Sequence, residues 1–294
     1  MICPRLNTAV IAKRKMNYRE LYEFGCLQLK TAVISDYKND ARLLLEYVCK
    51  TSYNDLYVNG EKEIPFEKEE EYHSMLEKRA SHIPLQHLTG IQTFMGLDFM
   101  VNSNVLVPRP DTEILVEEVL KDTHDGMRIL DMCTGSGCIL LSLINYSNDT
   151  QGVGADISPA ALEVAKENAE KLGLFERVSF VESNLFEGIE GKFDIVVSNP
   201  PYIKTKEIET LMPEVKEYDP FIALDGHEDG LFFYRKIVKE CKPFMFRGSL
   251  LAFEIGNDQA AEVSKLLEEE GFADISVYKD YGNNDRVVKG FYRG

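Results

Sequence analysis

From about residue 111 onward, short apolar runs alternate with segments whose apolar residues recur at helical spacing. The runs have the length of buried strands and lie at 128–132, 152–156, 178–182, 193–198 and 249–254. Ser158 is the expected N-cap of one intervening helix, and Gly173 its expected end. Strands that alternate with helices predict an α/β fold with a mainly parallel sheet covered on both faces. Two further runs, 274–279 and 286–292, flank a short polar turn, so we expect an antiparallel pair at the end of the sheet.

Before this region, the chain has the pattern of a small helical bundle. Leu21, Phe24 and Leu27 recur at near-helical spacing and predict the apolar face of one helix. In the next helix, Asn39 or Asp40 is the expected N-cap, because both residue types can accept a hydrogen bond from a free backbone N–H group.

The stretch between these two regions predicts a β-hairpin, since apolar residues alternate on both sides of Gly96. Residues 1–15 are basic and contain no acid. We interpret them as an extension ahead of a more natural start at Met16, with a transit peptide as the alternative. The expected parts are an N-terminal extension, a helical domain, a hairpin linker and an α/β domain, at residues 1–15, 16–88, 89–108 and 109–294.

Composition narrows the classes of partner. The net charge of the 294 residues is −16, which argues against a protein whose affinity depends on contacts with nucleic-acid phosphates. No apolar run approaches the roughly 18 residues of a membrane span. The six cysteines are scattered, without a C-x-x-C pair or a histidine at zinc-ligand spacing. We therefore expect free thiols in a reducing cytoplasm and no metal site.

The segment RILDMCTGSGCIL has the pattern of a strand, a tight turn and a helix, with Gly135 and Gly137 in the turn. Glycines let the backbone pass close to a ligand, and the turn after the first strand of an open α/β sheet lies at the ligand crevice. The next strand ends at Asp156, and an acid at this place can accept both hydroxyls of a ribose. Since the glycines of a pyrophosphate-binding loop are absent, the pattern favours an adenosine compound without phosphates, S-adenosylmethionine.

The third strand is followed by Asn184, which can hydrogen-bond the edge of adenine, and by Leu185 and Phe186, either of which can flank the ring. The alternative is that these residues only turn the chain. Together with the two preceding strand ends, they predict a nucleoside pocket at one edge of the sheet.

The fourth strand runs into Asn199, Pro200, Pro201 and Tyr202. Each proline fixes its own φ and holds the residue before it extended, so the strand must stop and continue as a stiff loop beside the predicted cofactor site. The Asn199 carboxamide oxygen and the Pro200 carbonyl can then point the same way, as two fixed acceptors for a planar NH2 group. The ring of Tyr202 offers a face on which a flat amide or base can stack.

Such an arrangement suits methyl transfer to an NH2 nitrogen, whose delocalised lone pair makes it a poor nucleophile. Two acceptors that draw on its hydrogens favour in-line attack on the activated methyl and stabilise the positive charge that develops on nitrogen. No general base has to act first, because the methylated nitrogen loses its proton easily. The motif leaves open whether the nitrogen belongs to a protein amide or to an exocyclic amine of adenine or guanine.

Six further segments, in order across about residues 17–292, resemble the HemK-type protein N5-glutamine methyltransferases that modify peptide chain release factors. They are IPLQHLTG, VLVPRPDTE, ILDMCTGSG, YDPFIALDGHEDGL, FEIG and YGNNDRVV. The resemblance implies a helical N-terminal domain, a β-hairpin linker and a seven-stranded class I (Rossmann-like) S-adenosylmethionine-dependent methyltransferase domain. It also implies methylation of the glutamine in a Gly-Gly-Gln loop of release factors, with S-adenosylhomocysteine as the product. Neither nucleic acid nor a membrane is expected as a partner.

Carried over by motif, the resemblance assigns cofactor binding to the segment CTGSG and to Asp156. With the neighbouring strand ends included, the expected cofactor-binding residues are Cys133, Thr134, Gly135, Ser136, Gly137, Asp156, Ile157, Asn184, Leu185 and Asn199. Asn184 stands where many relatives have aspartate. The substrate glutamine is assigned to Asn199, Pro200, Pro201 and Tyr202, of which Asn199, Pro200 and Tyr202 take the catalytic role. Arg109 and Glu113 are expected to organise the mouth of the site.

Two other functions are kept as alternatives. A methyltransferase acting on ribosomal RNA guanine or on adenine would need a basic surface around the pocket and salt-dependent binding. A non-catalytic scaffold would bind the release factor and transfer nothing. A nicotinamide dehydrogenase is disfavoured, because the third glycine of its fingerprint is missing from TGSGCIL.

Overall fold

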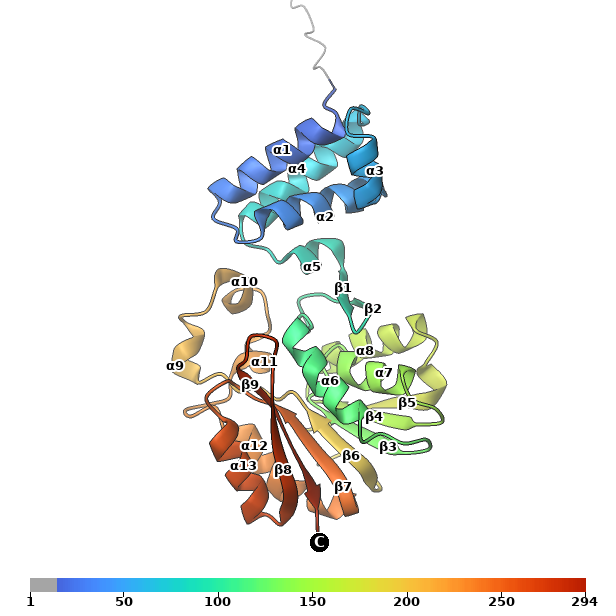
Figure 1. Cartoon of the computed structure of the whole chain (residues 1–294), viewed down its shortest axis with the longest axis vertical. Coiled ribbons are helices and arrows are strands. Elements are labelled where there is room, and N and C mark those ends of the chain that lie inside the picture. The colour runs from blue at the N-terminus through green and yellow to red at the C-terminus, as the bar shows by residue number, and fades with distance from the viewer. Residues whose placement is uncertain (1–14) are drawn as a thin grey trace, which may run out of the picture. The chain divides into compact units, whose positions relative to one another are not determined.

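The computed structural model describes residues 15–294, and the chain divides into two compact units at residues 1–89 and 90–294 (Figure 1). Cys3 and nearly all of the predicted N-terminal extension lie outside the described residues. Within the described range, the free thiols that the sequence predicts are Cys26, Cys49, Cys133, Cys138 and Cys241. None of the helices between residues 15 and 294 has both the length and the apolar character needed to cross a membrane.

The first unit is helical, as predicted. Its helices are α1 (Tyr18–Thr31), α2 (Tyr37–Cys49), α3 (Tyr53–Val58), α4 (Phe66–Ala80) and α5 (Leu85–Thr89). α1 begins with a capping box, in which Asn17 accepts from the Glu20 N–H at 2.9 Å and the Glu20 carboxylate accepts from the Asn17 N–H at 3.1 Å. Apolar residues of α1, α2 and α4 form the shared core of this unit.

The predicted N-cap of α2 is wrong. α2 begins at Tyr37 with Asp36 at the N-cap position, so neither Asn39 nor Asp40 caps it. Asp40 is buried instead, and its carboxylate accepts a hydrogen bond from the Arg79 guanidinium of α4 at 2.7 Å. The error has a physical reason: the residues next to an acid in the sequence do not reveal whether it caps a helix or pairs with a buried arginine from another helix.

The buried face of α1 includes Leu21 and Gly25, whereas Leu27, which the sequence places on this face, is 66% exposed. Gly25 is required here because Tyr72 of α4 crosses α1 at this point. A Cβ at residue 25 would lie 2.1 Å from the Tyr72 hydroxyl oxygen. Tyr72 is fully buried and donates a hydrogen bond to the Ala41 carbonyl of α2 at 3.0 Å. The glycine thus lets a side chain of α4 reach α2.

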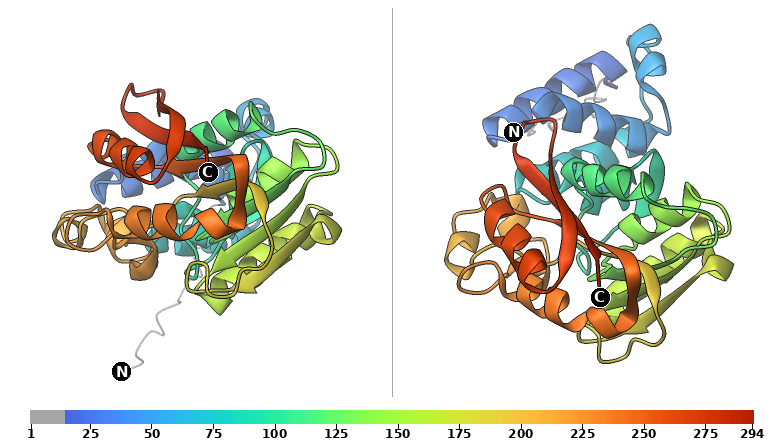
Figure 2. Two further views of the ribbon diagram at one scale, coloured as in Figure 1. Left: turned by 90° about the horizontal axis from the view of Figure 1, so that it is seen from below. Right: turned by 60° about the horizontal axis from the view of Figure 1, so that its bottom comes forward.

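The second unit contains a seven-stranded sheet with the strand order β5-β4-β3-β6-β7-β9-β8. The strands are β3 (Arg128–Met132), β4 (Gln151–Asp156), β5 (Val178–Glu182), β6 (Phe193–Ser198), β7 (Met245–Glu254), β8 (Phe272–Lys279) and β9 (Asp285–Tyr292). β5, β4, β3, β6 and β7 are parallel, and β9 is antiparallel to both β7 and β8. Figure 2 shows β8 and β9 side by side at the red end of the chain. The predicted α/β fold and its antiparallel edge are therefore confirmed.

Helices cover both faces of this sheet. The helices and 3-10 turns are η1 (Pro110–Thr112), α6 (Glu113–Leu120), α7 (Cys138–Asn145), α8 (Pro159–Lys171), η2 (Phe175–Arg177), α9 (Thr205–Ile208), α10 (Pro213–Lys216), α11 (Phe221–Leu224), α12 (Phe232–Glu240), η3 (Lys242–Phe244) and α13 (Ala260–Glu269). Ile195 and Val197 of β6 belong to a core shared with α6 and α7. Val196, between them, belongs to a core shared with α12 and α13. Alternate residues of one strand thus fill the two layers.

The start of β7 differs from the prediction. The sequence predicts the strand from residue 249, but β7 begins at Met245. Its pairing with β6 is irregular, because Phe193 faces Met245 while Ile195 faces Leu250. Gly248, with φ 93°, lies inside this irregular stretch, and the two residues before it, Phe246 and Arg247, are exposed. A strand that is interrupted in this way does not show the continuous apolar run by which buried strands are recognised.

β1 (Ile91–Phe94) and β2 (Leu97–Met100) form the predicted hairpin. Its turn residues, Met95 and Gly96, both have positive φ, as two-residue hairpin turns favour. Asn168 of α8 holds the other end of the hairpin: its carboxamide accepts from the Met100 N–H at 2.6 Å and donates to the Met100 carbonyl at 3.0 Å. The hairpin is therefore part of the second unit and is packed on its helix α8.

Gly25→Ala is expected to destabilise the helical unit by about 1–3 kcal/mol, even though alanine favours a helix over glycine by roughly 1 kcal/mol. The added methyl overlaps the Tyr72 hydroxyl and displaces that ring from α2. Amide hydrogen exchange in α1, α2 and α4 measures the effect, with the exposed substitution Glu23→Ala as the control. Unchanged protection in Gly25→Ala would contradict this packing.

Candidate active site

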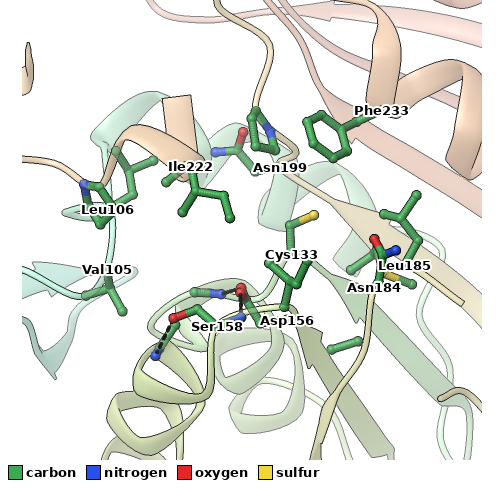
Figure 3. Close-up of a pocket in the computed structure, with 18 of the residues that line it drawn as sticks. Val105, Leu106, Cys133, Asp156, Ser158, Asn184, Leu185, Asn199, Ile222 and Phe233 are labelled. Atoms are coloured by element: carbon green, nitrogen blue, oxygen red, sulfur yellow. Dashed lines mark hydrogen bonds between the residues drawn. The ribbon is translucent and has the colours of Figure 1, made fainter. Parts of the chain in front are cut away.

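The carboxyl ends of β3, β4, β5 and β6 border a cavity of about 350 Å³. Ligands of open parallel sheets bind in the crevice at this edge. Figure 3 shows Asp156 and Asn199 facing the cavity from opposite sides. The predicted site residues that line it are Cys133, Gly135, Asp156, Ile157, Asn184, Leu185, Asn199 and Pro201.

Two backbone N–H groups hold the Asp156 carboxylate. Gly135 donates to Oδ2 and Ser158 donates to Oδ1, both at 2.9 Å. Burial raises the pKa of this carboxyl, while the backbone hydrogen bonds oppose the shift by favouring the ionised form. Ser158 also caps α8 as predicted, because its hydroxyl accepts from the Ala161 N–H at 3.2 Å. Each carboxylate oxygen keeps a further lone pair, so Asp156 can accept hydrogen bonds from a ligand in a fixed orientation.

Thr134, Ser136 and Gly137 complete the glycine turn but do not line the cavity. The Thr134 hydroxyl donates to the buried Asp131 carboxylate at 2.6 Å. Gly137, with φ 79°, is the N-cap of α7, and a Cβ there would lie 3.2 Å from Ala165. These residues shape the turn, and their direct contact with a cofactor stays a prediction.

The part of the cavity next to β5 offers an acceptor. The Asn184 amide NH2 donates to the Glu187 carboxylate at 3.0 Å, which leaves its carbonyl oxygen to accept from an amine. Leu185 and Cys133 line the cavity with φ of 52° and 63°. Such left-handed conformations cost non-glycine residues roughly 1–2 kcal/mol, so the backbone of this wall is strained at both positions.

Asn199 lies on the cavity wall, and its amide NH2 donates to the Thr112 hydroxyl at 3.4 Å. Within residues 15–294, neither its carbonyl oxygen nor the backbone carbonyl of Pro200 accepts a hydrogen bond. Pro200 itself is buried behind the wall, whereas Pro201 contributes to it. The loop therefore carries two acceptors that no described residue occupies.

Tyr202 does not line the cavity, and hydrogen bonds to neighbouring segments hold both its side chain and its backbone. Its hydroxyl donates to the Glu254 carboxylate, at the end of β7, at 3.2 Å. Burial raises the pKa of this phenol far above its ordinary value. The Tyr202 backbone carbonyl accepts from the Gln259 amide at 3.0 Å. Stacking of the ring on a substrate amide stays a prediction.

Backbone hydrogen bonds join the segment just before α12 to the loop that follows β6. The Ile203 N–H donates to the Leu224 carbonyl at 3.0 Å, and the Gly226 N–H donates to the Ile203 carbonyl at 2.8 Å. The two segments are so close that a Cβ at Gly226 would lie 2.7 Å from the Tyr202 Cα. A Cβ at Gly230 would lie 2.4 Å from the Tyr202 carbonyl oxygen. Both positions thus require glycine, which accounts for part of the motif ALDGHEDGL.

Arg109 ties together two loops that contribute wall residues. Its guanidinium pairs with the buried Asp219 carboxylate at 2.5 Å, and Asp219 also accepts from the Val107 N–H at 3.5 Å. Arg109 does not line the cavity, and neither does Glu113, whose carboxylate accepts from the Met95 N–H of the hairpin turn at 2.6 Å. The roles of Arg109 and Glu113 at the mouth of the site stay predictions.

The cavity is also lined by residues to which the sequence analysis assigns no part in ligand binding. They are Asn104, Val105, Leu106, Met132, Ala155, Ser158, Ala161, Ser183, Pro220, Ile222, Ala223, His227, Phe232 and Phe233. The segments VLVPRPDTE and YDPFIALDGHEDGL contain several of them, but that signal marks a stretch of chain and not the side chains that face a ligand. In Figure 3, Leu106 and Ile222 lie on one side of the cavity and Phe233 on another.

The strand order, the glycine turn and the acceptor loop after β6 together define a class I methyltransferase. Residues 109–215 match the family described as "Methyltransferase small domain". A solved methyltransferase structure from Pyrococcus furiosus has the same fold, with a TM-score of 0.52 and 19% identity over 68% of this chain and 91% of that chain.

The particular family follows from closer relatives. Residues 20–90 match the family described as "PrmC N-terminal domain". The release factor glutamine methyltransferase of Clostridium acetobutylicum is 47% identical over 247 residues, which are 82% of this chain and 87% of that protein. That of Agrobacterium fabrum is 41% identical over 243 residues, 81% of this chain and 84% of that protein. This chain belongs to the release factor glutamine methyltransferases, and the resemblance seen in its motifs is confirmed.

Asp131 gives the methyltransferase unit a specific pH dependence. Burial raises the pKa of its carboxyl from 3.8 to about 7, against the hydrogen bonds from Thr134 and the backbone of Leu140. The folded state therefore binds this proton more tightly than the unfolded state. The free energy of unfolding falls as pH rises from about 4 to about 7, and this contribution is constant above that range.

Asp131→Asn has no carboxyl proton to lose at this position, so its free energy of unfolding should not fall for this reason between about pH 4 and about pH 7. Relative to the wild type, the variant should therefore become more stable as pH rises through this range. Each unit of pKa corresponds to about 1.4 kcal/mol. Chemical denaturation at a series of pH values measures it, with Asp125→Asn at an exposed carboxyl as the control. A difference that does not change with pH would refute the buried-proton explanation.

Proposed function

We propose that the chain transfers the methyl group of S-adenosylmethionine to the side-chain amide nitrogen of the glutamine in the Gly-Gly-Gln loop of peptide chain release factors. Family membership supports this activity and its substrate class. The observation that carries the proposal is the pair of unoccupied acceptors, the Asn199 carbonyl oxygen and the Pro200 carbonyl, on the stiff loop beside the cavity.

The cavity has a chemistry that fits S-adenosylmethionine, which supplies an activated methyl group on a sulfonium when bound. Its volume of about 350 Å³ suits a small ligand. Asp156 would accept the ribose hydroxyls, since backbone N–H groups already hold its two oxygens in place. The Asn184 carbonyl oxygen would accept from the adenine amine, and Ile157 and Leu185 would flank the ring. Gly135 lines the cavity without a side chain that could obstruct it.

The loop after β6 would act on the glutamine by holding its amide. The two amide hydrogens would be donated to Asn199 Oδ1 and to the Pro200 carbonyl, so the nitrogen is fixed in the plane that these acceptors define. Both acceptors stabilise the positive charge that develops on nitrogen during transfer. The proton is lost to solvent afterwards, once the nitrogen carries the new methyl and has become acidic. Tyr202, anchored through Glu254 and Gln259, keeps the loop in place.

The division of labour between the two units is also a proposal. Residues 16–88 would bind the release factor, residues 89–108 would connect the units, and residues 109–294 would carry out the reaction. The compact units at 1–89 and 90–294 support a separate helical module. Because release factors act where translation takes place, the cytoplasm is the proposed location.

Incubation with S-adenosylmethionine and purified unmodified release factor is expected to add one methyl group to the glutamine of the Gly-Gly-Gln peptide. Tandem mass spectrometry locates the group, and a release factor with asparagine in place of that glutamine is the control. Methylation of ribosomal RNA or DNA instead would establish the nucleic-acid alternative. Binding of the release factor without any transfer would establish the scaffold alternative.

Asn199→Ala and Asp156→Ala are expected to fail in different ways. Asn199→Ala removes a hydrogen bond to the substrate, worth about 1–3 kcal/mol, so turnover falls on the order of 10- to 100-fold while cofactor affinity changes little. Asp156→Ala removes the ribose acceptor and should weaken cofactor binding by a similar factor. Isothermal titration with S-adenosylhomocysteine and steady-state kinetics separate the two effects. Near-normal turnover of Asn199→Ala would remove that residue from the mechanism.

A further inference from the structure

One side of the cavity is bordered by two segments that belong to no strand. They contribute Asn104, Val105, Leu106, Pro220, Ile222 and Ala223 to its wall. In Figure 3, Leu106 and Ile222 lie on this side, whereas Asp156 ends β4 and Asn199 follows β6. The strand ends are held by the sheet, so the position of the wall on the other side depends on contacts between the two segments.

A buried carboxylate joins these two segments. Asp219 directly precedes the wall residue Pro220, and its side chain is fully buried. Its Oδ2 atom pairs with the Arg109 guanidinium at 2.5 Å, and its Oδ1 atom accepts from the Val107 N–H at 3.5 Å. One side chain of the second segment thus holds both a side chain and the backbone of the first.

Prolines make both segments stiff next to this ion pair. Pro108 and Pro110 enclose Arg109, and Pro220 follows the aspartate. A proline fixes its own φ and holds the residue before it extended, and Arg109 is extended, with φ −96° and ψ 144°. A displacement at the ion pair is therefore passed on to the neighbouring wall residues, because the backbone between them has little freedom to absorb it.

Ile222 shows that this wall has surface for a ligand to cover. It lines the cavity, yet it is 53% exposed. A ligand that fills the cavity would cover part of this apolar side chain, which is favourable because apolar surface leaves water. If the two segments separated, this contact would be lost and the ligand would leave more easily.

We propose that Asp219 is a positioning residue for cofactor binding: through its ion pair with Arg109, it holds the wall formed by Leu106 and Ile222 in place and sets how long the cofactor stays bound. This inference rests on the proposed function, which assigns the cavity to S-adenosylmethionine. Neither Arg109 nor Asp219 lines the cavity, so their effect passes through the wall residues. Removal of one partner leaves the other unpaired in a buried place, which favours local opening of the two segments.

Asp219→Asn tests the inference, because asparagine has the same shape and can still accept from the Val107 N–H, but it has no charge to pair with Arg109. Surface plasmon resonance on the immobilised full chain measures how fast S-adenosylhomocysteine dissociates. We expect dissociation from the variant to be about 10-fold faster than from the wild type. Arg109→Gln should act in the same direction, and it provides a second variant if Asp219→Asn does not fold, because the Arg109 side chain is 40% exposed.

Asp40→Asn is the matched control, because Asp40 and Arg79 form a buried ion pair in the helical unit at 2.7 Å, with both side chains 8% exposed. It should lower the melting temperature and leave the dissociation rate of S-adenosylhomocysteine unchanged. If Asp219→Asn and Arg109→Gln also lower the melting temperature but dissociate at the wild-type rate, the ion pair only stabilises the fold, and the inference is overturned.

The double variant Arg109→Gln with Asp219→Asn shows whether the two residues act as a pair. Its dissociation rate should be no higher than that of the faster single variant, since each substitution already breaks the same contact. Single effects that multiply in the double variant would overturn the inference. A wild-type chain that binds neither S-adenosylmethionine nor S-adenosylhomocysteine would instead refute the proposed cofactor site, so the two failures are distinguishable.

Discussion

The central constraint in this protein is the immobility of the few residues that follow β6. Two consecutive prolines restrict the backbone, but they do not decide where the loop lies. The position of the loop is set by contacts with other segments. Ile203 is hydrogen-bonded to the segment before α12, and the Gln259 amide donates a hydrogen bond to the Tyr202 carbonyl. A reacting nitrogen tolerates a misplacement of only about 1 Å before rates drop on the order of 100-fold, so this external support determines whether the two acceptors are useful.

Segments that are far apart in the sequence meet behind this loop and support it. The Tyr234 hydroxyl of α12 donates to the Glu254 carbonyl at 2.9 Å and lies 3.3 Å from the Gln259 amide oxygen, so α12, β7 and the residue before α13 share one network. Arg286, in the motif YGNNDRVV, donates to the Ile255 carbonyl at 3.3 Å and pairs with Asp280 at 3.0 Å. Residues of the motifs FEIG, ALDGHEDGL and YGNNDRVV thus support the loop that follows β6, on the side of the loop away from the cavity.

Features that depend on local periodicity could be predicted from the sequence. The predicted strands at 178–182 and 193–198 coincide with β5 and β6, and Ser158 caps α8 as expected. Features that depend on tertiary contact could not. The sequence cannot show that Thr134 turns inward to Asp131, that the hydroxyl of Tyr202 is anchored, or that Ile222 and Phe233 face the cavity, because no repeat or spacing encodes such contacts. The hydrogen bond between Asn199 and Thr112 belongs to this second class, since the two residues are 87 positions apart in the chain.

The most direct test of this account is a crystal structure of the protein with S-adenosylhomocysteine and a peptide that contains Gly-Gly-Gln. The account predicts that the glutamine amide nitrogen lies within about 3.2 Å of both Asn199 Oδ1 and the Pro200 carbonyl oxygen. It also predicts that the nitrogen lone pair is directed at the position from which the methyl has departed. A glutamine side chain that is bound elsewhere, or an Asn199 amide NH2 facing the glutamine nitrogen, would contradict the account.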